Sequence, residues 1–209
     1  MSGISADEAA VRPIRRRKNM RSEQSVRKLI DAAVEELAQS PYADFTVRAV
    51  AARAAVSPTT AYTYFPSKDA LIAEVYLRLL RDARTFVDVN DSAETRVKSQ
   101  LRELLLLLAD TPYLADACST ALMADDAFVN DARLRIAAEV SRRITASLGP
   151  QSSHDVVTTL HMVFSGATMH ARSTPGGYRQ MADHLDRAVS MVMNSGLIKP
   201  ATDLSSPGQ

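Results

Sequence analysis

Glycine is almost absent from the first two thirds of this chain, and that absence limits the folds and functions open to it. The 209 residues include seven glycines, and none lies between Gly3 and Gly149. Phosphate-binding loops of the P-loop and dinucleotide types need closely spaced glycines, because backbone amides must approach the ligand. The G-x-S-x-G turn of serine hydrolases is absent as well. Since long β-branched runs are also few, the sequence favours an all-α fold.

Composition indicates an ordinary globular protein of the reducing cytoplasm. Hydrophobic residues make up 46% of the chain and the formal net charge is +1, which excludes disordered and collagen-like classes. The single cysteine, Cys118, cannot form an internal disulfide. The longest apolar run, Leu104 to Ala109, is far too short to span a membrane. No apolar stretch follows the charged N-terminal residues, so we expect no secretory signal and no membrane partner.

Apolar residues recur at helical spacing along most of the chain, and prolines mark several of the breaks. The pattern predicts helices over residues 22–40, 47–54, 58–65, 67–86, 93–110, 112–124, 126–148, 153–173 and 177–195. We divide the chain into a flexible basic arm (1–21), a small helical unit (22–68), a helical bundle (69–196) and a polar tail (197–209).

Residues 46–65 predict a helix-turn-helix. A helix capped by Thr46 is followed by a tight turn and by a second short helix, with Ser57 as its N-cap and Pro58 at its first position. The second helix carries Thr59, Thr60 and Thr63 away from its packing side, and short hydroxyl side chains suit base edges and phosphates. The alternative is a pair of short helices in a bundle, with threonines tolerated on an exposed face.

Basic residues are concentrated at the N-terminal end. The segment from Arg12 to Arg21 holds six positive charges and no acidic residue. Residues 1–70 hold 11 basic and 8 acidic side chains, against 14 and 16 in residues 71–209. Such a run is either a solvated tail or an arm that binds a polyanion.

Three segments resemble a known family: T-V-R-x-V-A from Thr46, A-A-V-S from Ala54, and T-A-Y-T-Y-F-P-S-K-D-A-L from Thr60. They are similar to the DNA-binding domain of the TetR family of bacterial transcriptional repressors, and the resemblance is specific over residues 22–72. It implies a nine-helix architecture: a three-helix DNA-binding unit, then a helical domain for ligand binding and dimerisation. The turn departs from the family pattern, because Ala55 stands where glycine is usual. A left-handed backbone there would cost roughly 1 kcal/mol.

The resemblance assigns DNA contacts to residues of this chain. Arg48 would reach a base or a phosphate, and Tyr62 and Tyr64 resemble the family's phosphate-contacting and packing aromatics. Lys68 would hold a phosphate together with the amides of the fourth helix, unless it is a solvated lysine beside Asp69. The basic arm would follow the backbone or enter the minor groove. The expected DNA-binding residues are Arg15, Arg16, Arg17, Lys18, Arg21, Thr46, Arg48, Pro58, Thr59, Thr60, Tyr62, Thr63, Tyr64 and Lys68.

The last two predicted helices are the candidates for a dimer interface. No Asp, Glu, Lys or Arg occurs in the sixteen positions from Val156 to Ala171, and a helix uncharged all round must be covered all round. In TetR-like proteins, two such helices from each of two subunits form the interface. The expected interface residues are Leu160, Phe164, Ala167, Ala171, Met181, Leu185, Ala188 and Val192.

An apolar set in the bundle, with a few polar groups, resembles the lining of a ligand site, although such stripes can also be plain core. It comprises Leu104, Leu108, Tyr113, Cys118, Leu122, Met123, Phe128, His161, Met162 and Met169. Because few charges lie on the predicted inward faces, we expect a largely hydrophobic small-molecule effector.

Catalysis and metal binding have little support in the sequence. His161 and His170 face opposite sides of a helix, and His154 and His161 lie about 10 Å apart along it, too far for one ion. No cofactor motif is present. We therefore predict a homodimeric regulator that binds double-stranded DNA, most simply a repressor released from a palindromic operator by its effector. The alternatives are a helical adaptor, which would not explain the basic arm, and an enzyme.

Overall fold

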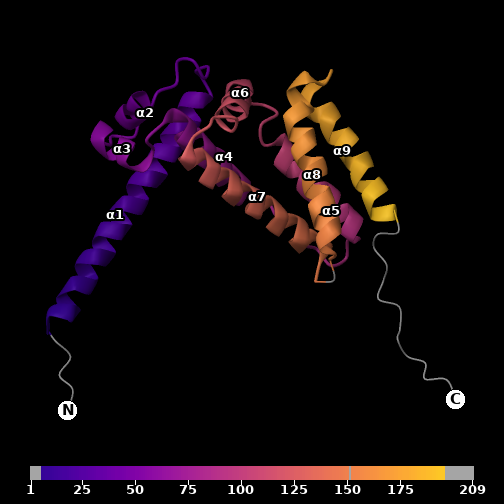
Figure 1. Cartoon of the computed structure of the whole chain (residues 1–209), viewed down its shortest axis with the longest axis horizontal. Coiled ribbons are helices and arrows are strands. Elements are labelled where there is room, and N and C mark those ends of the chain that lie inside the picture. The colour runs from indigo at the N-terminus through magenta and orange to yellow at the C-terminus, as the bar shows by residue number, and fades with distance from the viewer. Residues whose placement is uncertain (1–5, 151, 196–209) are drawn as a thin grey trace, which may run out of the picture.

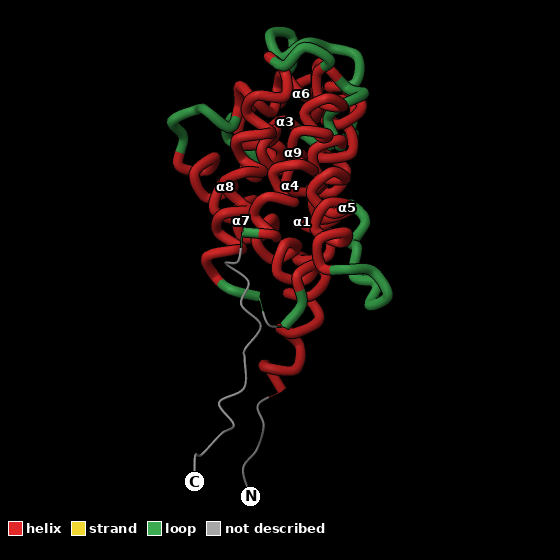
Figure 2. Tube along the Cα trace, turned by 90° about the vertical axis from the view of Figure 1, so that its right-hand side faces the viewer, coloured by secondary structure: helices red, strands yellow, loops and turns green. Residues whose placement is uncertain are grey.

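The computed structural model describes residues 6–150 and 152–195, with side chains described from Arg21 onward. These residues form nine α-helices and one 3₁₀ turn, which confirms the predicted all-α fold (Figure 2). The helices are α1 (Ala6–Leu37), α2 (Val47–Arg53), α3 (Pro58–Tyr64), α4 (Lys68–Asp82), α5 (Ala93–Leu106), α6 (Pro112–Ala121), α7 (Ala127–Leu148), α8 (His154–His170) and α9 (Gly177–Asn194). Within the described ranges, none of them combines the length and the apolar character that crossing a membrane requires.

Local capping explains where the short helices begin. The side chains of Thr46, Ser57 and Ser67 accept hydrogen bonds from backbone N–H groups three residues further on, at the starts of α2, α3 and α4. Each bond satisfies a donor that a helix N-terminus otherwise leaves without an intrahelical partner. Pro58 occupies the first turn of α3, where its missing N–H costs nothing. The predicted caps at Thr46 and Ser57 are therefore confirmed.

The first helix differs from the prediction, because it begins at Ala6 instead of near residue 22. The segment assigned to a flexible arm thus continues α1, which projects from the rest of the molecule (Figure 1). The predicted helix begins near residue 22 because its apolar stripe begins there, yet alanine, arginine and lysine favour helix without such a stripe. The side chains of Arg15, Arg16, Arg17 and Lys18 lie outside the described residues, as does the predicted tail from residue 197 onward.

The helices form two parts with one continuous core. Helix α1 packs on α2, α3 and α4, while α4, α5, α7, α8 and α9 pack against one another in the bundle (Figure 1). Buried apolar residues run without a break from Leu29 in α1 to Val189 in α9. Helix α4 belongs to both parts, because it packs on α1 as well as on α6 and α7.

A buried arginine holds the end of α4. Arg143 of α7 is only 1% exposed, and its guanidinium donates to the carbonyl oxygens of Arg81 and Arg84 at 2.9 and 3.0 Å. Its Nε donates to the carboxylate of Glu139 at 2.8 Å. A buried cation requires such partners, and the carbonyl of Arg81, in the last turn of α4, lies at the negative end of the helix dipole. The sequence pattern did not single out Arg143.

Gln100 of α5 holds the connection between α4 and α5 in a similar way. Its side-chain amide donates to the carbonyl of Arg84 at 3.0 Å and accepts from the N–H of Phe86 at 3.2 Å. Ser147 donates to the carbonyl of Phe86 at 3.3 Å. Two helices of the bundle therefore fix the path of the chain after α4.

Candidate nucleic-acid interface

The turn between α2 and α3 has a left-handed backbone at Ala55, the position where the family usually has glycine. Ala55 adopts φ = 52°, a left-handed conformation. The N–H of Val56 donates to the carbonyl of Ala51 at 3.0 Å, and the N–H of Ala55 to that of Ala52 at 3.2 Å. This is the Schellman pattern that ends helices, in which glycine is preferred at the left-handed position. The alanine thus keeps the turn and carries a backbone strain that glycine would avoid.

Helix α3 presents one polar face. Ala61 is fully buried and Phe65 is 4% exposed, so these two side chains anchor the helix on the core. Thr59, Tyr62 and Thr63 lie on the opposite, exposed side. The recognition face predicted from the sequence is therefore open to a ligand at these three positions.

Thr60 differs from the other threonines of α3. Its side chain is half-buried, and its hydroxyl lies 2.8 Å from that of Ser57, the N-cap of the helix. It is thus part of the cap. Thr46 is likewise occupied in capping α2, where it accepts from Ala49 at 3.1 Å. Arg48, the second residue of α2, is exposed and has no such structural role among the described contacts.

Two other predicted contacts have partners inside the protein. The Tyr64 hydroxyl donates to Ser22 of α1 at 2.8 Å. The family resemblance suggested phosphate contact or packing for the two tyrosines, and this bond fits a packing role for Tyr64. Lys68 donates from Nζ to the carbonyl of Tyr42 at 3.0 Å, and Nζ lies 3.8 Å from the centre of the Tyr42 ring. Burial, and then the hydrogen bond to Asp69, raise the pKa of Tyr42 to about 12. Lys68 is thus neither free in solvent nor paired directly with Asp69, and its other N–H groups remain available to a phosphate.

The start of α4 is also tied to the bundle. Ser67, the N-cap of α4, donates to Oδ2 of Asp126 at 2.9 Å. Asp126 is itself the N-cap of α7, where its Oδ1 accepts from the N–H of Phe128 at 2.7 Å. One hydrogen bond thus connects the first residues of two helices from the two parts of the chain.

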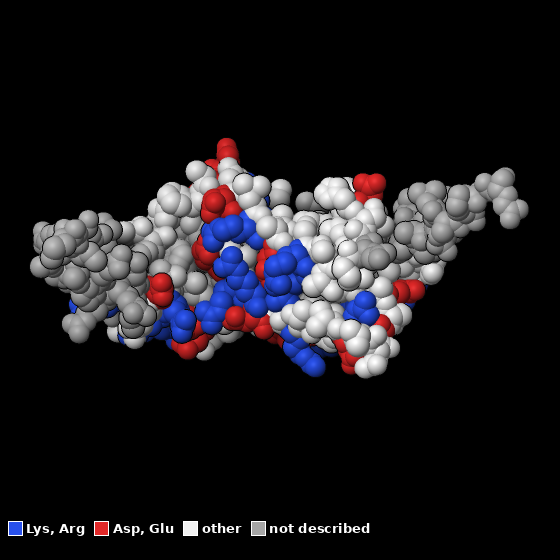
Figure 3. All heavy atoms as spheres, turned by 90° about the horizontal axis from the view of Figure 1, so that it is seen from below, with Lys and Arg blue, Asp and Glu red and all other residues white. Residues whose placement is uncertain are grey.

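Charge on the described surface is mixed. Figure 3 shows Lys and Arg side chains gathered on one face, with Asp and Glu side chains among them. Several arginines of the described chain are paired with carboxylates: Arg78 with Asp82, Arg135 with Glu74, and Arg102 with Asp186. The bundle therefore offers no uniformly basic surface at these positions, and Arg21, exposed on α1, is the described part of the basic segment.

The expected dimer residues lie mostly inside the single chain. Five of the eight are between 0 and 8% exposed, which corrects their assignment to a surface: Leu160, Phe164, Ala167, Ala171 and Leu185. They contribute to the chain's own core, while Met181, Ala188 and Val192 are half-buried. The uncharged stretch is explained in part by α9 and α7 covering α8. Its exposed face instead carries Met162 and Met169, at 62% and 66%.

The bundle contains a partly open cavity of about 240 Å³, which we call the inner cavity. Six of the ten expected ligand residues line it: Leu108, Cys118, Leu122, Met123, His161 and Met169. The sequence analysis missed the others: Tyr76, Ser119, Ile136, Val140, Phe164, Ser165 and Thr168. Four expected residues do not line it. Leu104 is core, Tyr113 and Phe128 are exposed in the first turns of α6 and α7, and Met162 lines a second hollow.

Burial keeps the ionisable groups of the inner cavity neutral. It raises the pKa of the Cys118 thiol to about 12, raises that of Tyr76, and lowers that of His161. No Asp, Glu, Lys or Arg is among the lining residues. A mostly apolar, uncharged group suits such a cavity. Across the described residues, no group of three or more His, Cys, Asp or Glu side chains is arranged to hold a metal ion.

Comparison with known proteins identifies the family. Residues 29–75 match the model of the bacterial regulatory proteins of the tetR family. An uncharacterized HTH-type transcriptional regulator of Mycobacterium tuberculosis is 44% identical over 187 residues, covering 88% of this chain and 87% of the relative. The chain belongs to the TetR family. Over the shorter span of 56 residues, 27% of this chain and 28% of the relative, it is also 45% identical to the BetI regulator of Brucella melitensis.

Solved structures share the TetR fold of this chain. A TetR regulator from Rhodococcus sp. RHA1 superposes with a TM-score of 0.69 at 21% identity, over 82% of this chain and 96% of that one. FadR of Thermus thermophilus, solved with lauroyl-CoA, gives 0.61 at 18% identity, over 88% and 100%. BioQ, solved with its double-stranded DNA operator, gives 0.52 at 22% identity, over 78% and 98%. As a TetR-type helix-turn-helix transcriptional regulator, the chain is not an enzyme.

Proposed function

We propose that this TetR-family chain is a homodimeric repressor that binds a palindromic DNA operator through α3 and is released from it by a small, largely apolar effector. The observation that carries the proposal is the arrangement of α3: Ala61 and Phe65 fix one side in the core while Thr59, Tyr62 and Thr63 are exposed on the other. Short hydroxyl side chains on an exposed recognition helix suit the edges of bases in the major groove.

Other side chains would position the duplex. Arg48 on α2 and the ammonium of Lys68, held beside Tyr42, are suited to phosphates on either side of the groove. The basic residues Arg15, Arg16, Arg17 and Lys18 precede this unit along α1 and would add sequence-independent attraction. BioQ, which shares the fold, was solved on its operator, and this supports the same use of the unit here.

An effector would occupy the inner cavity. The cavity is lined by apolar side chains and no fixed charge, and its walls come from α4, α6, α7 and α8. Because α4 begins at the DNA-binding unit, a ligand that prefers another position of α4 would lower operator affinity by its differential affinity for the two conformers. FadR of Thermus thermophilus, with the same fold, was solved with lauroyl-CoA, which supports an apolar ligand.

Dimerisation would use the exposed face of α8. Thr158, Met162, Ser165 and Met169 follow one another at helical spacing on that face. Substituting Met162→Glu should then place a charge in a covered surface and shift sedimentation toward monomers. Leu134 of α7 is 72% exposed, so Leu134→Glu is the matched control and should leave the assembly unchanged. A fully dimeric Met162→Glu protein would move the interface elsewhere.

The DNA proposal is tested with a pair of matched threonines. The hydroxyls of Thr63 and Thr120 both donate to the carbonyl four residues earlier at 2.9 Å, and both side chains are exposed. After selection of a binding site from random duplexes, Thr63→Ala should change base preference by about 1–3 kcal/mol at one position of each half-site. Thr120→Ala should change nothing. Lys68→Ala should weaken all sequences equally and reduce the salt dependence of binding. An unaltered consensus for Thr63→Ala would contradict readout by α3.

A further inference from the structure

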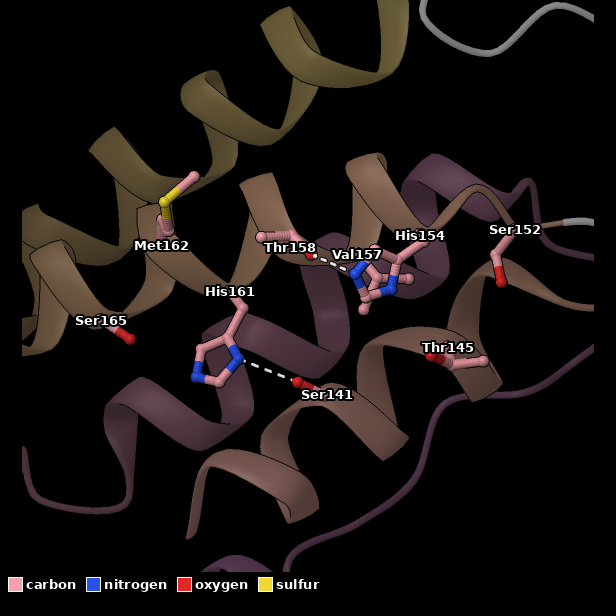
Figure 4. A pocket seen from close by; sticks show the side chains of 9 residues that line it. All are labelled: Ser141, Thr145, Ser152, His154, Val157, Thr158, His161, Met162 and Ser165. Carbon is pink, nitrogen blue, oxygen red and sulfur yellow. Dashed lines mark hydrogen bonds between the residues drawn. The ribbon is translucent and has the colours of Figure 1, made fainter. Parts of the chain in front are cut away.

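The polar groups around the inner cavity differ in whether they already have partners. Ser119 and Thr168 each donate to the backbone carbonyl four residues earlier, at 2.9 and 3.0 Å. Nδ1 of His161 lies 2.9 Å from the hydroxyl of Ser141 on α7 (Figure 4). Ser165 is exposed on the face of α8 that we assign to the second subunit. The polar groups that remain for a ligand are therefore those that α4 and α6 contribute.

Tyr76 of α4 is a buried side chain whose hydroxyl has no partner in the protein. It lines the inner cavity and is only 4% exposed. The hydroxyl makes no hydrogen bond to any other described residue, and it is not wholly enclosed by protein atoms. It therefore faces the open space of the cavity. Because a buried hydroxyl without a partner is unfavourable, a ligand with a complementary group would gain free energy by bonding to it.

A second buried tyrosine shows that an unpartnered hydroxyl alone does not make a binding site. Tyr178 of α9 is 8% exposed, and its hydroxyl likewise has no partner among the described residues. That hydroxyl is wholly enclosed, and Tyr178 is not part of the cavity lining. A ligand in the inner cavity can thus reach the hydroxyl of Tyr76 but not that of Tyr178.

The chemistry around Tyr76 favours a hydrogen-bond acceptor on the ligand. Burial raises the pKa of Tyr76, so its hydroxyl stays protonated at neutral pH and can donate. Cys118 of α6, which lines the same cavity, keeps its proton for the same reason, and a thiol is a weak second donor. Apolar side chains supply most of the remaining lining. A carbonyl oxygen, which has two lone pairs and no proton, suits these donors.

We propose that Tyr76 is the polar recognition residue of the inner cavity, and that the effector is an uncharged, largely apolar molecule that carries a carbonyl group. The carbonyl accepts a hydrogen bond from the Tyr76 hydroxyl, and the hydrocarbon part occupies the apolar remainder of the cavity. No Lys or Arg lines the cavity, so a carboxylate would lose its hydration without gaining a cation. Because Tyr76 belongs to α4, the bond forms on the helix that begins at the DNA-binding unit. This inference rests on the proposed effector function of the inner cavity.

Matched probes isolate the hydrogen bond. The ketones are the alkyl phenyl series from acetophenone to hexanophenone, and their controls are the alkenes in which a CH₂ group replaces the carbonyl oxygen. Calorimetry measures the affinity of the whole chain for each probe. Tyr76→Phe should weaken ketone binding about tenfold, because the buried carbonyl loses its donor, and should leave alkene binding within about twofold. Equal changes for the two series, or no change in either, would overturn the assignment.

Tyr178→Phe is the matched control, since it removes the same hydroxyl from a buried tyrosine outside the cavity. It should leave the affinities for both series within about twofold of wild type. Neither hydroxyl has a partner in the described chain, so both variants should unfold at the wild-type temperature. Benzoate, which is close to acetophenone in size, should bind the wild-type protein at least about tenfold more weakly than acetophenone does. Equal affinity for these two probes would overturn the assignment of an uncharged effector.

The outcomes separate this inference from the function on which it rests. If ketones and alkenes bind and Tyr76→Phe affects them equally, the role of Tyr76 is wrong and an effector cavity remains. If Tyr76→Phe weakens only the ketones but saturating ketone leaves the wild-type protein on its DNA, the ligand site stands and effector release is wrong. If no probe binds the wild-type protein, both are wrong.

Discussion

The DNA-binding unit and the bundle place their polar side chains in opposite ways. In the unit, the polar side chains of α2 and α3 are exposed or half-buried: Arg53 and Tyr64 bond to Glu36 and Ser22 of α1, and Thr59, Tyr62 and Thr63 are open to a partner. In the bundle, polar groups are taken into the core: the buried polar and charged side chains of the described chain are Gln100, Glu139, Arg143 and Ser147. The polar bonds of the unit thus lie near its surface, whereas the path of the chain after α4 depends on buried directional bonds.

This difference separates stability from recognition. Changes on the exposed face of the unit should alter DNA binding with little effect on the free energy of unfolding. Changes to the buried polar groups of the bundle should do the reverse, since a buried group left without a partner is costly. The following substitutions test that separation, in order of expected size.

Arg143 should give the largest effect. Arg143→Met removes a buried cation, leaves the carbonyl of Arg81 in the last turn of α4 without this donor and takes one partner from the buried Glu139, so the free energy of unfolding should fall by about 3–5 kcal/mol. Arg142 pairs with the same Glu139 at 2.6 Å but its side chain is 59% exposed, and Arg142→Met should cost under about 1 kcal/mol. Urea denaturation measures both. Equal losses would mean that burial of Arg143 does not matter.

Substitution of two equivalent N-cap serines compares the DNA-binding unit with the bundle directly. Ser57 at α3 and Ser92 at α5 each accept from a backbone N–H at 3.1 Å and contact a threonine hydroxyl, at 2.8 and 2.9 Å. Each serine-to-alanine change should cost about 1 kcal/mol of unfolding free energy. Only Ser57→Ala should also weaken operator binding, since it loosens the recognition helix. The comparison breaks down if Ser92→Ala lowers DNA affinity as much.

A substitution at Ala55 should raise the free energy of unfolding instead of lowering it. Ala55→Gly should raise the free energy of unfolding by up to about 1 kcal/mol, because glycine accepts φ = 52° without strain. Part of that gain is offset by the greater freedom of glycine in the unfolded chain. Ala52→Gly, in the helical part of α2, should lower it by about 1 kcal/mol. Thermal unfolding of the two variants should therefore shift in opposite directions, and shifts of the same sign would contradict the strained turn.

The smallest effect is a pH dependence from the wall of the inner cavity. Burial lowers the pKa of His161 below its ordinary value near 6.5. As the pH falls below about 6.5, the unfolded chain takes up a proton that the folded chain does not, so the free energy of unfolding decreases. The decrease continues until the pH passes the folded pKa. His161→Gln should remove this part of the slope, measured as the difference between denaturation curves of wild type and variant. Identical slopes would mean that burial does not shift this group.

Sequence patterns predicted α2, the turn and α3 to within one residue because their signals are local. The caps at Thr46 and Ser57 and the position of Ala55 each depend on a few consecutive residues. For the bundle, the sequence predicted the helices but not which face of each helix is buried. From Val156 onward helix α8 has no Asp, Glu, Lys or Arg, so periodicity could not tell that Phe164 is buried in the core while Met162 is exposed. Arg143 and Gln100 escaped notice because their partners lie far away in the sequence.

The hydrogen bond between Ser67 and Asp126 sets a rule for building hybrid regulators from this chain. A recombinant sensor that kept residues 1–67 and took its bundle from another protein would separate the serine from its carboxylate acceptor. The exchanged module would then enter the new scaffold with the start of α4 untethered. Grafts should therefore transfer the serine and the aspartate together, even though fifty-eight residues of unrelated sequence lie between them.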